Sequence, residues 1–366
     1  MVSILIVGGG IGGLSIAREL SMRNLKVSVI ERAEKLNPVG AGIIMNPNAM
    51  RVLERNGLAD QVRADSWPYL IRETRDHTGR LLATRDYRPL YESGKLAQGA
   101  LVHRAHLLDV LFRSLPAGTV QFGVSLKSIP PDVDLVIGAD GIHSQVRREI
   151  FGDVPKRYMG YRSHRLIMEN VAGVRCFTEY LGRGQRIGLV PIGEKRLYIW
   201  TTYNSPRDAA PVEDFQEFFR QFSDAGIRRL FAALPPLSSI ITTEIEELWM
   251  DDWVRLSTTN ATVLLGDAAH AITPNIGQGA GMAMEDAAVL AEELARGGEI
   301  EHALGNYAKR RKPRVQTVMR ISREVGEDGQ RSSALGCWLR NRRVEKAGRD
   351  VERSLAELEQ LLAFSG

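Results

Sequence analysis

Four short apolar runs along the chain predict buried strands of a parallel sheet. A strand that is covered on both faces is typically a continuous apolar run rather than an alternation of apolar and polar residues. Between the first two runs, Leu14, Ala17 and Leu20 recur at helical spacing, so the chain opens with a strand, a helix and a second strand. The four runs are residues 4–7, 27–30, 134–138 and 262–265.

The middle of the chain has a different pattern. Turn residues separate short β-like runs from residue 67 to 100, and strand patterns dominate from residue 157 to 253. One amphipathic helix is expected at 212–222, and this mixture predicts a sheet with helices on one side. The expected strands are residues 174–180, 186–191, 196–202 and 240–249.

The last third of the chain is predominantly helical in pattern. Helices are expected at 280–296 and 300–322, and the tail from 343 to 364 carries an apolar stripe along one helical face. Such a stripe favours docking on the same chain, and a dimer contact is the alternative. Its members are Val344, Ala347, Val351, Leu355, Leu358 and Leu362.

Composition is that of a globular protein of one or two domains. The 366 residues are 44% hydrophobic and 25% charged, and 48 basic residues against 44 acidic ones leave a net charge of +4. The arginines are scattered, so a nucleic-acid partner is not expected. No apolar run has the length needed to cross a bilayer and the N-terminus lacks a signal-peptide pattern, so no membrane span is expected and a cytoplasmic protein is predicted. Because Cys176 and Cys337 are isolated from one another, no metal site or disulfide framework is expected.

The first motif is a glycine cluster that follows the first strand and opens the first helix. Its residues run Gly8, Gly9, Gly10, Ile11, Gly12, Gly13. Glycines in this context let the backbone approach a pyrophosphate at a helix N-terminus. Glu31 ends the second strand, where a carboxylate accepts hydrogen bonds from ribose hydroxyls. An acid there disfavours a 2′-phosphate, so FAD or NAD is a better fit than NADP.

Two further motifs follow the third and fourth apolar runs. Asp140 and Gly141 come after the third run, and Gly266 and Asp267 come after the fourth. An Asp-Gly pair alone is commonly just a turn. Pro274 then begins a loop whose Gly277, Gln278 and Gly279 introduce a helix, and such backbone N–H groups favour negative charge.

In order and spacing, these three motifs resemble those of the FAD-dependent class A aromatic hydroxylases, which have the p-hydroxybenzoate hydroxylase fold. The resemblance covers nearly the whole chain, and it is similar in particular to salicylate, 6-hydroxynicotinate and urate hydroxylases. It implies an α/β protein with a discontinuous Rossmann-like FAD-binding domain, a sheet-and-helix substrate domain and C-terminal helices. The expected FAD-binding domain is 1–66, 101–152 and 256–325, the substrate domain is 67–100 and 153–255, and the C-terminal helical segment is 326–366.

The resemblance also implies a cofactor site and a reaction. The enzyme would use non-covalent FAD, with NADH or NADPH as a transient reductant and O2 as co-substrate. One oxygen atom would pass from a flavin C4a-hydroperoxide to a small aromatic or heteroaromatic substrate. The implied FAD-binding residues are Gly8, Gly10, Ile11, Gly12, Gly13, Glu31, Arg32, Arg104, Asp140, Gly141, Gly266, Asp267, Pro274, Gly277, Gln278 and Gly279.

The substrate side is less defined by sequence. Strand alternation puts Arg196, Tyr198, Trp200 and Thr202 on one face, and the resemblance implies roles for Arg196 and Tyr198 near flavin or substrate. Tyr161, Arg162 and His164 on the preceding segment are further candidates. Two alternatives stay open: a flavoenzyme of the same fold that performs epoxidation, Baeyer–Villiger oxidation or isoprenoid reduction, and a non-catalytic flavin-binding redox sensor. The oligomeric state is expected to be a monomer or a homodimer.

Overall fold

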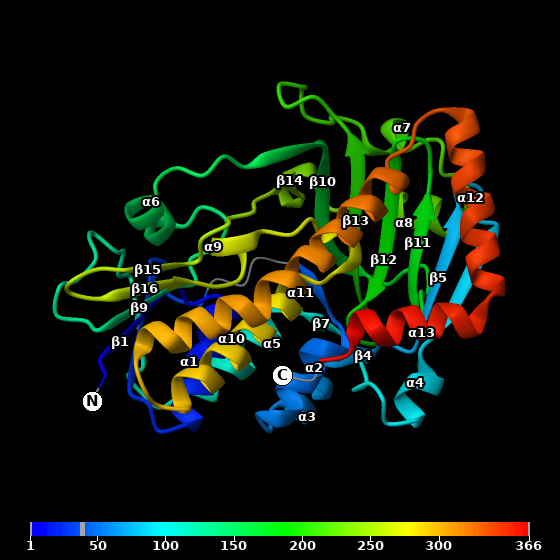
Figure 1. Cartoon of the computed structure of the whole chain (residues 1–366). Helices are drawn as coiled ribbons and strands as arrows, with labels where there is room; N and C mark the ends of the chain where they lie inside the picture. The colour runs from blue at the N-terminus through cyan, green and yellow to red at the C-terminus, as the bar shows by residue number, and fades with distance from the viewer. Residues whose placement is uncertain (1, 37–40, 365–366) are drawn as a thin grey trace.

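The computed structural model describes residues 2–36 and 41–364. Two large sheets lie at opposite ends of an elongated molecule, and the long helix α11 (Ile300–Gly329) runs from one toward the other (Figure 1). Part of the glycine-rich segment after Glu31, residues 37–40, lies outside the described residues.

The first sheet contains all four predicted apolar strands. β1 (Ile4–Val7) pairs in parallel with both β2 (Val27–Glu31) and β9 (Leu135–Gly138), and β16 (Ala261–Leu264) pairs in parallel with β9. The sheet is completed by β8 (Val120–Phe122) at one edge and by the antiparallel β15 (Val254–Leu256) at the other. Its strands therefore come from stretches far apart in the sequence, as expected of a discontinuous unit.

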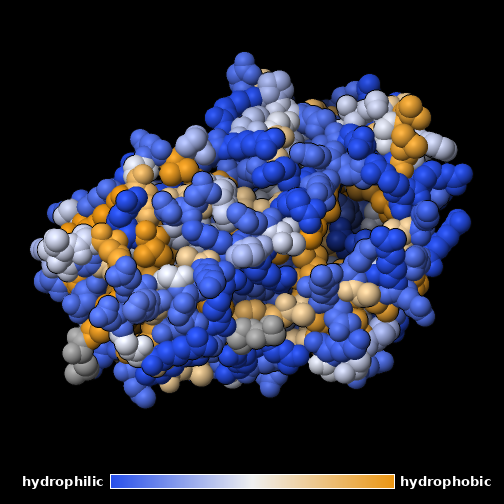
Figure 2. All heavy atoms as spheres, viewed as in Figure 1, coloured by the Kyte–Doolittle hydropathy of each residue, from blue (hydrophilic) through white to orange (hydrophobic). Residues whose placement is uncertain are grey.

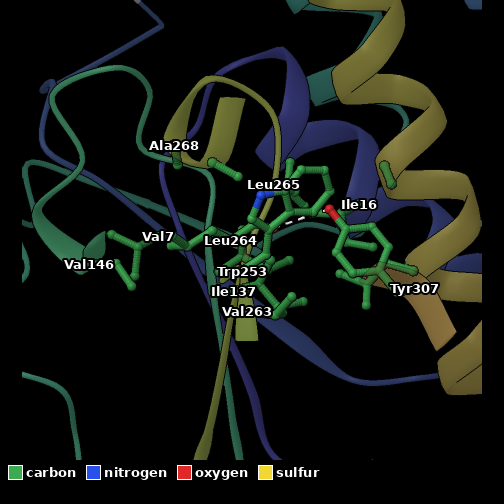
Figure 3. Packing of buried hydrophobic residues seen from close by; sticks show 14 of the residues in the cluster. Val7, Ile16, Ile137, Val146, Trp253, Val263, Leu264, Leu265, Ala268 and Tyr307 are labelled. Carbon is green, nitrogen blue, oxygen red and sulfur yellow. Dashed lines mark hydrogen bonds between the residues drawn. The ribbon is translucent and has the colours of Figure 1, made fainter. Parts of the chain in front are cut away.

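Helices pack beside this sheet in two neighbouring apolar clusters. α1 (Ile11–Met22) packs against α10 (Gly279–Ala295) and α5 (Arg104–Arg113), and α2 (Pro47–Arg55) packs against α10 and α3 (Ala59–Ala64). Trp253 is fully buried, and the Tyr307 hydroxyl donates a hydrogen bond to the Leu264 carbonyl at 3.1 Å (Figure 3). α11 is thereby fixed to the strand that precedes Gly266 and Asp267.

The second large sheet has seven strands and is mainly antiparallel. β5 and β11 are its one parallel pair among the described strands, and the short helices α7 (Phe215–Phe218) and α8 (Ala225–Ala232) cover one face with a cluster of phenylalanines. The order is β14 (Ile241–Glu247), β10 (Arg157–Glu169), β13 (Arg196–Asn204), β12 (Gln185–Pro191), β11 (Phe177–Leu181), β5 (Ile71–Asp76) and β6 (Leu81–Asp86).

The helix expected at 212–222 is shorter than predicted. Asp214 caps α7 by accepting a hydrogen bond from the Glu217 N–H at 3.0 Å, and the helix ends four residues later. Phe215, Phe219 and Phe222 keep the spacing of one helical face, and all three enter the same buried cluster. The α-helix nevertheless ends at Phe218, and a turn follows at 219–221.

Small elements connect the two large sheets. The strands β3 (Gly42–Met45), β7 (Ala100–His103) and β4 (Ser66–Pro68) form a third sheet. The remaining helices in this part of the chain are α4 (Arg88–Glu92), α6 (Gln145–Phe151) and the short α9 (Asp267–His270). Among the described residues, no helix has the length and apolar character needed to cross a bilayer.

The C-terminal stripe forms two helices rather than one. α12 (Ala334–Arg349) ends at Asp350, whose side chain caps α13 (Val351–Leu362) by accepting from the Arg353 N–H at 3.3 Å. Leu355, Leu358 and Leu362 pack into a cluster with Tyr198, which confirms docking on the same chain for this half of the stripe. Ala347 and Val351, from the other half, are exposed. The face seen in Figure 2 is mostly hydrophilic and has a hollow beside α12 and α13.

Candidate active site

A cavity of about 900 Å³ lies between the two large sheets and brings together most of the predicted cofactor residues. Pockets of roughly 300–1,000 Å³ are typical for small molecules and cofactors. Both sheets contribute walls, since Asp267 comes from the first and Tyr198 from the second. The predicted residues that line it are Gly10, Ile11, Gly12, Arg104, Gly141, Gly266, Asp267, Pro274, Gly277, Gly279 and Tyr198.

The first motif forms a tight turn in which one glycine is left open to the cavity. A Cβ on Gly8 would lie 2.5 Å from the Ala139 carbonyl oxygen, and a Cβ on Gly13 would lie 1.8 Å from the Gly8 carbonyl oxygen. Only glycine therefore permits this approach of α1 to β1 and β9. A Cβ on Gly10 would meet nothing within 4 Å, so its backbone is accessible to a ligand at the start of α1.

Glu31 lies directly beside this turn. Its Oε2 accepts a hydrogen bond from the Gly9 N–H at 2.6 Å, and its Oε1 accepts from the Ala33 N–H at 2.9 Å. The neighbouring Arg32 is exposed and is not among the described residues that line the cavity. The carboxylate is thus held at the end of β2, where the sequence predicts ribose recognition.

Asp140 of the second motif leaves one carboxylate oxygen without a partner. Oδ2 accepts from the Gln145 N–H at 2.6 Å and the Val146 N–H at 3.2 Å, which fixes the start of α6. Oδ1 is buried and has no hydrogen-bond partner within the part of the chain that the structure describes. Asp140 itself is not among the described residues that line the cavity, although Ala139 and Gly141 on either side of it are.

Asp267 and Arg104 both line the cavity, and each charge only partly offsets the effect of burial on the other. Burial raises the pKa of Asp267 above its usual range, although the charges of His270 and Arg104 oppose this shift. Burial also lowers the pKa of Arg104, while Asp267 opposes that shift. Neither side chain forms a hydrogen bond with a described residue, and the Asp267 side chain is accessible from the cavity. Both groups are therefore available to a ligand.

The loop before α10 is held by two asparagines. The Asn46 amide donates to the Gly277 carbonyl at 2.9 Å, and the Asn48 amide donates to the Gln278 side-chain oxygen at 2.8 Å. Asn46 directly precedes α2, but its side chain does not cap that helix. Gly277 has a φ of 65°, a backbone conformation that favours glycine. The helix starts at Gly279, one residue before the expected 280, with its N-terminus at the cavity.

A buried ionic cluster supports this loop from behind. The His270 Nε2 lies 2.6 Å from the Asp286 Oδ2, and the Gly266 N–H donates to the same oxygen at 2.9 Å. Arg311 pairs with Glu285 at 2.6 Å and with Asp286 at 2.7 Å. Burial would raise the pKa of Asp286, but the positive charges of His270 and Arg311 outweigh it and hold the pKa at about 2. His270 thus supports the third motif rather than facing the cavity.

The second large sheet forms the opposite wall. Tyr198, Trp200 and Thr202 line the cavity from one face of β13, as the alternation predicts. Arg196 lies at the start of the same strand but pairs with Asp65 and is not among the described lining residues. Its predicted role near flavin or substrate remains untested.

The cavity contains a different arginine that sequence analysis missed. Arg186 of β12 lies 5.2 Å from the Trp200 ring centre, and its Nη1 donates to the Asn275 side-chain oxygen at 2.8 Å. It also pairs with Glu179 at 2.6 Å. Burial would raise the pKa of Glu179, but Arg186 and Arg72 outweigh it and hold the pKa at about 2. Only the register between β12 and β13 brings Arg186 to this wall.

The candidates on β10 face differently from the prediction. Ser163 and Arg165 line the cavity, whereas His164 packs between Tyr203 and Phe215 with ring centres 4.7 Å and 4.5 Å away. Arg162 donates a hydrogen bond to the Ala209 carbonyl at 2.8 Å. Strand alternation puts Arg165 on the same face as Ser163 and could have identified it. The sequence does not mark where this strand begins, so that signal was missed.

Comparisons with known proteins agree with this architecture. The family described as "FAD binding domain" matches residues 1–112 and 132–322. The Stigmatella aurantiaca "Aurachin C monooxygenase/isomerase" is 33% identical, covering 95% of each chain. The "2-heptyl-3-hydroxy-4(1H)-quinolone synthase" of Pseudomonas aeruginosa is 30% identical over 93% of this chain and 92% of that protein. The structure of Klebsiella pneumoniae HpxO complexed with FAD and uric acid has a TM-score of 0.88 at 25% identity, covering 99% of this chain and 96% of that one.

The chain therefore belongs to the FAD-binding family and binds FAD. It is an FAD-dependent monooxygenase of the aromatic hydroxylase type, as the sequence motifs predict. The open backbone at Gly10 and the free Asp267 and Arg104 side chains, all on the cavity, fit this cofactor.

Proposed function

We propose that this enzyme inserts one oxygen atom into a small aromatic or heteroaromatic substrate held against the wall of the seven-stranded sheet. The observation that carries the proposal is the single cavity shared by the cofactor motifs and that sheet face. When bound, FAD supplies the oxygen chemistry, with NADH or NADPH as the reductant and O2 as co-substrate.

The cofactor end of the cavity has groups suited to each part of FAD. The turn at Gly10 and the start of α1 would receive the pyrophosphate, with Glu31 accepting from the adenosine ribose. Arg104 would neutralise phosphate charge, and Asp267 would accept hydrogen bonds from ribityl hydroxyls. Gly8, Gly12, Gly13, Gly141 and Gly266 would allow close backbone approach, and Arg32 would lie near the adenosine end.

The start of α10 would stabilise negative charge on the isoalloxazine. Its positive end faces the cavity through Gly277 and Gly279, while Pro274 and Gln278 shape the loop. Pre-oriented backbone donors of this kind stabilise charge without reorganising. The asparagine contacts and the buried ionic cluster would keep the loop in that position.

Two aromatic side chains line the substrate end of the cavity. Trp200 and Tyr198 provide flat apolar surface with a polar edge, which suits an aromatic ring. Arg186 would fix the Trp200 ring from the next strand. Excluding water here protects a reactive oxygen donor from loss to solvent.

Several expectations from sequence are retained as proposals. The FAD-binding domain is proposed as 1–66, 101–152 and 256–325, with 67–100 and 153–255 as the substrate domain, because the strands of each large sheet fall within these ranges except for β15, which begins at Val254. A cytoplasmic location and a monomeric or homodimeric state are proposed from sequence alone.

The decisive experiment is oxygen incorporation by the FAD-loaded enzyme. Oxidation of NADH and NADPH would be followed with 6-hydroxynicotinate, 3-amino-4-hydroxybenzoate, urate and 2-heptyl-4-quinolone under ¹⁸O2. We expect one compound class to accelerate NAD(P)H oxidation and to gain a single ¹⁸O atom. Oxidation that yields only hydrogen peroxide with every compound would contradict the proposal for these substrate classes.

A further inference from the structure

The helix α12 presents an apolar patch to the solvent. Leu335, Trp338 and Leu339 are 67%, 56% and 46% exposed, and their spacing of three and four residues puts them on one face of the helix. Figure 2 shows hydrophobic atoms at this end of α12, close to α7. Single exposed leucines are normal on a protein surface, whereas three large apolar side chains on one helical face form a candidate contact surface.

The opposite face of α12 fixes the helix to the rest of the protein. Arg340 is buried and donates hydrogen bonds to the Gly182 carbonyl at 2.9 Å and to the Gly329 carbonyl at 3.1 Å. At the far end, a Cβ on Gly348 would lie 2.7 Å from the Ala83 Cβ, so the helix lies directly on β6. No side chain of the apolar patch belongs to an apolar cluster of the described core, so the fold leaves this patch unused.

The same outward face becomes basic toward the other end of the helix. Arg342, Lys346 and Arg349 follow the apolar patch at helical spacing, and all three are exposed. The Arg342 guanidinium lies 5.6 Å from the Trp338 ring centre, so the apolar and basic halves adjoin. α12 contains five basic residues and one acidic residue, an excess equal to the +4 net charge of the whole chain.

Nearby acids neutralise little of this basic half. The three cations line a shallow surface depression of about 570 Å³ together with Glu345 and Asp350. Glu345 pairs with Arg80 at 2.6 Å and, at 3.4 Å, with the first of the three cations, while Asp350 caps α13. Lys346 and Arg349 form no hydrogen bond or ion pair with a described residue, so their charges are available to an anionic partner.

Three kinds of partner would use this face differently. A nucleic acid would contact the cations but leave the apolar patch in water. A second copy of the chain would bury the patch, but a two-fold contact brings two helices of the same positive charge together. An anionic bilayer uses both halves, since Trp and Leu side chains enter the region between headgroups and acyl chains while Lys and Arg attract the lipid phosphates.

We propose that the outward face of α12 docks the enzyme on an anionic lipid surface. The apolar patch would enter the lipid interface, and the three cations would lie against the phosphates. The helix would then lie in the plane of the interface, as a peripheral contact that does not cross the bilayer. This inference does not depend on the reaction or the substrate proposed for the cavity.

Vesicle sedimentation of the FAD-loaded full chain tests this surface. The vesicles would contain phosphatidylcholine alone or with about 30% phosphatidylglycerol, and we expect the anionic vesicles to bind about tenfold or more tightly. Leu335→Ser combined with Trp338→Ser should weaken this binding about tenfold or more. Undiminished binding by the double variant overturns the proposal, and so does a wild-type chain that does not sediment with anionic vesicles.

Two triple variants of equal charge separate position from net charge. Changing the three cations of α12 to glutamine should reduce the preference for anionic vesicles to about twofold or less. The control changes three exposed arginines on other elements and should keep the wild-type preference. It combines Arg113→Gln, Arg148→Gln and Arg320→Gln. An equal loss in both variants would show attraction by net charge alone and overturn the proposal.

Quenching by brominated lipid locates the inserted side chains. Tryptophan fluorescence of wild type should fall on anionic brominated vesicles, and it should fall much less in Trp338→Phe, which keeps an apolar ring and should still bind. Equal quenching in both would put the contact on another part of the chain and overturn the assignment to α12. If wild type binds no vesicles and dimerises, while the double serine variant is monomeric, the face is a contact between copies and the proposal is wrong.

Discussion

Trp200 lies flat across Gly188 of the neighbouring strand, and the space for its ring exists because Gly188 has no side chain. A Cβ at Gly188 would lie 2.0 Å from the indole Cε2. The Arg186 guanidinium, from the same strand as Gly188, lies 5.2 Å from the ring centre. The shape of the substrate wall thus depends on a residue that contributes no side chain to it.

Gly188→Ala should therefore disturb the substrate wall. Forced overpacking typically costs about 1–3 kcal/mol, and we expect a loss of stability in that range together with weaker binding of aromatic ligands. FAD affinity should change little, because the cofactor motifs lie on the opposite side. Thermal unfolding and flavin-detected titration measure the two effects. Gly305→Ala, in an exposed helical position with nothing within 4 Å, should leave both unchanged or slightly raise stability.

His164 should make the fold sensitive to mild acid. Burial, and to a smaller extent the Arg162 charge, lower its pKa from the ordinary 6.5 to about 4. In the unfolded chain, His164 binds a proton as the pH falls below 6.5, whereas in the folded chain it binds one only near pH 4. The free energy of unfolding is therefore highest above pH 6.5 and decreases as the pH falls below that value. The expected loss between pH 7 and pH 5 is about 2 kcal/mol.

Urea unfolding at pH 7 and pH 5 checks this sign. His164→Phe should show a clearly smaller loss than wild type between the two values. His302→Gln, at an exposed position of α11, should follow the wild-type curve. An identical loss in wild type and His164→Phe would show that other groups govern this range.

At the scale of elements, α10 and α11 are joined by buried charge rather than by apolar packing alone. Glu285 and Asp286 of α10 and Arg311 of α11 are all 3% exposed or less. The Asn48 amide donates to Glu285 at 2.7 Å, and the Gly266 N–H donates to Asp286 at 2.9 Å, so the pair of helices also holds both ends of the third motif.

Arg311→Met should be strongly destabilising, because it leaves two buried carboxylates without their shared cation. Removing one partner from a buried ion pair typically costs about 3–5 kcal/mol. Urea unfolding at pH 7 measures it. Arg320→Met on the same helix removes a side chain that is 61% exposed, and its cost should stay below about 1 kcal/mol.

Elements that are marked by the local pattern of apolar and polar residues could be predicted from the sequence. The four apolar strands, the start of α10 and the face of β13 that carries Tyr198 follow from composition and period. Arg186 and the asparagines of α2 could not be found, because Arg186 reaches the cavity through strand register and the asparagines reach the loop before α10 through packing of distant segments. Arg165 was missed because the sequence does not mark where β10 begins. The break at Asp350 follows from a capping contact that apolar periodicity does not reveal.

At the scale of the whole molecule, the C-terminal helix closes the structure over the substrate wall. Leu362 is 4% exposed and packs in the cluster that contains Tyr198, while Arg314 of α11 donates to the Leu361 carbonyl at 2.7 Å. This helix thus contacts both the long connecting helix and the cluster behind the cavity wall.

Leu362→Ala should lower the free energy of unfolding by about 2 kcal/mol or more, because a buried leucine is lost and a void remains. Val351→Ala is the matched control at the other end of α13, where the side chain is 57% exposed, and its effect should be within about 0.5 kcal/mol. Thermal and urea unfolding compare them. Equal effects at the two positions would mean that α13 is not packed as described.

The discontinuous first sheet has a consequence for synthesis. In the sheet, β1 is followed on one side by β9 and then by β16, although these strands lie far apart in the sequence. Gly10 and Asp267 line the same cavity, and Gly10 is translated long before Asp267. At about 5–20 residues per second, a ribosome leaves a gap on the order of tens of seconds between the two. The FAD-binding site of the nascent chain is therefore incomplete through most of translation. FAD can bind to the complete site only near the end of synthesis.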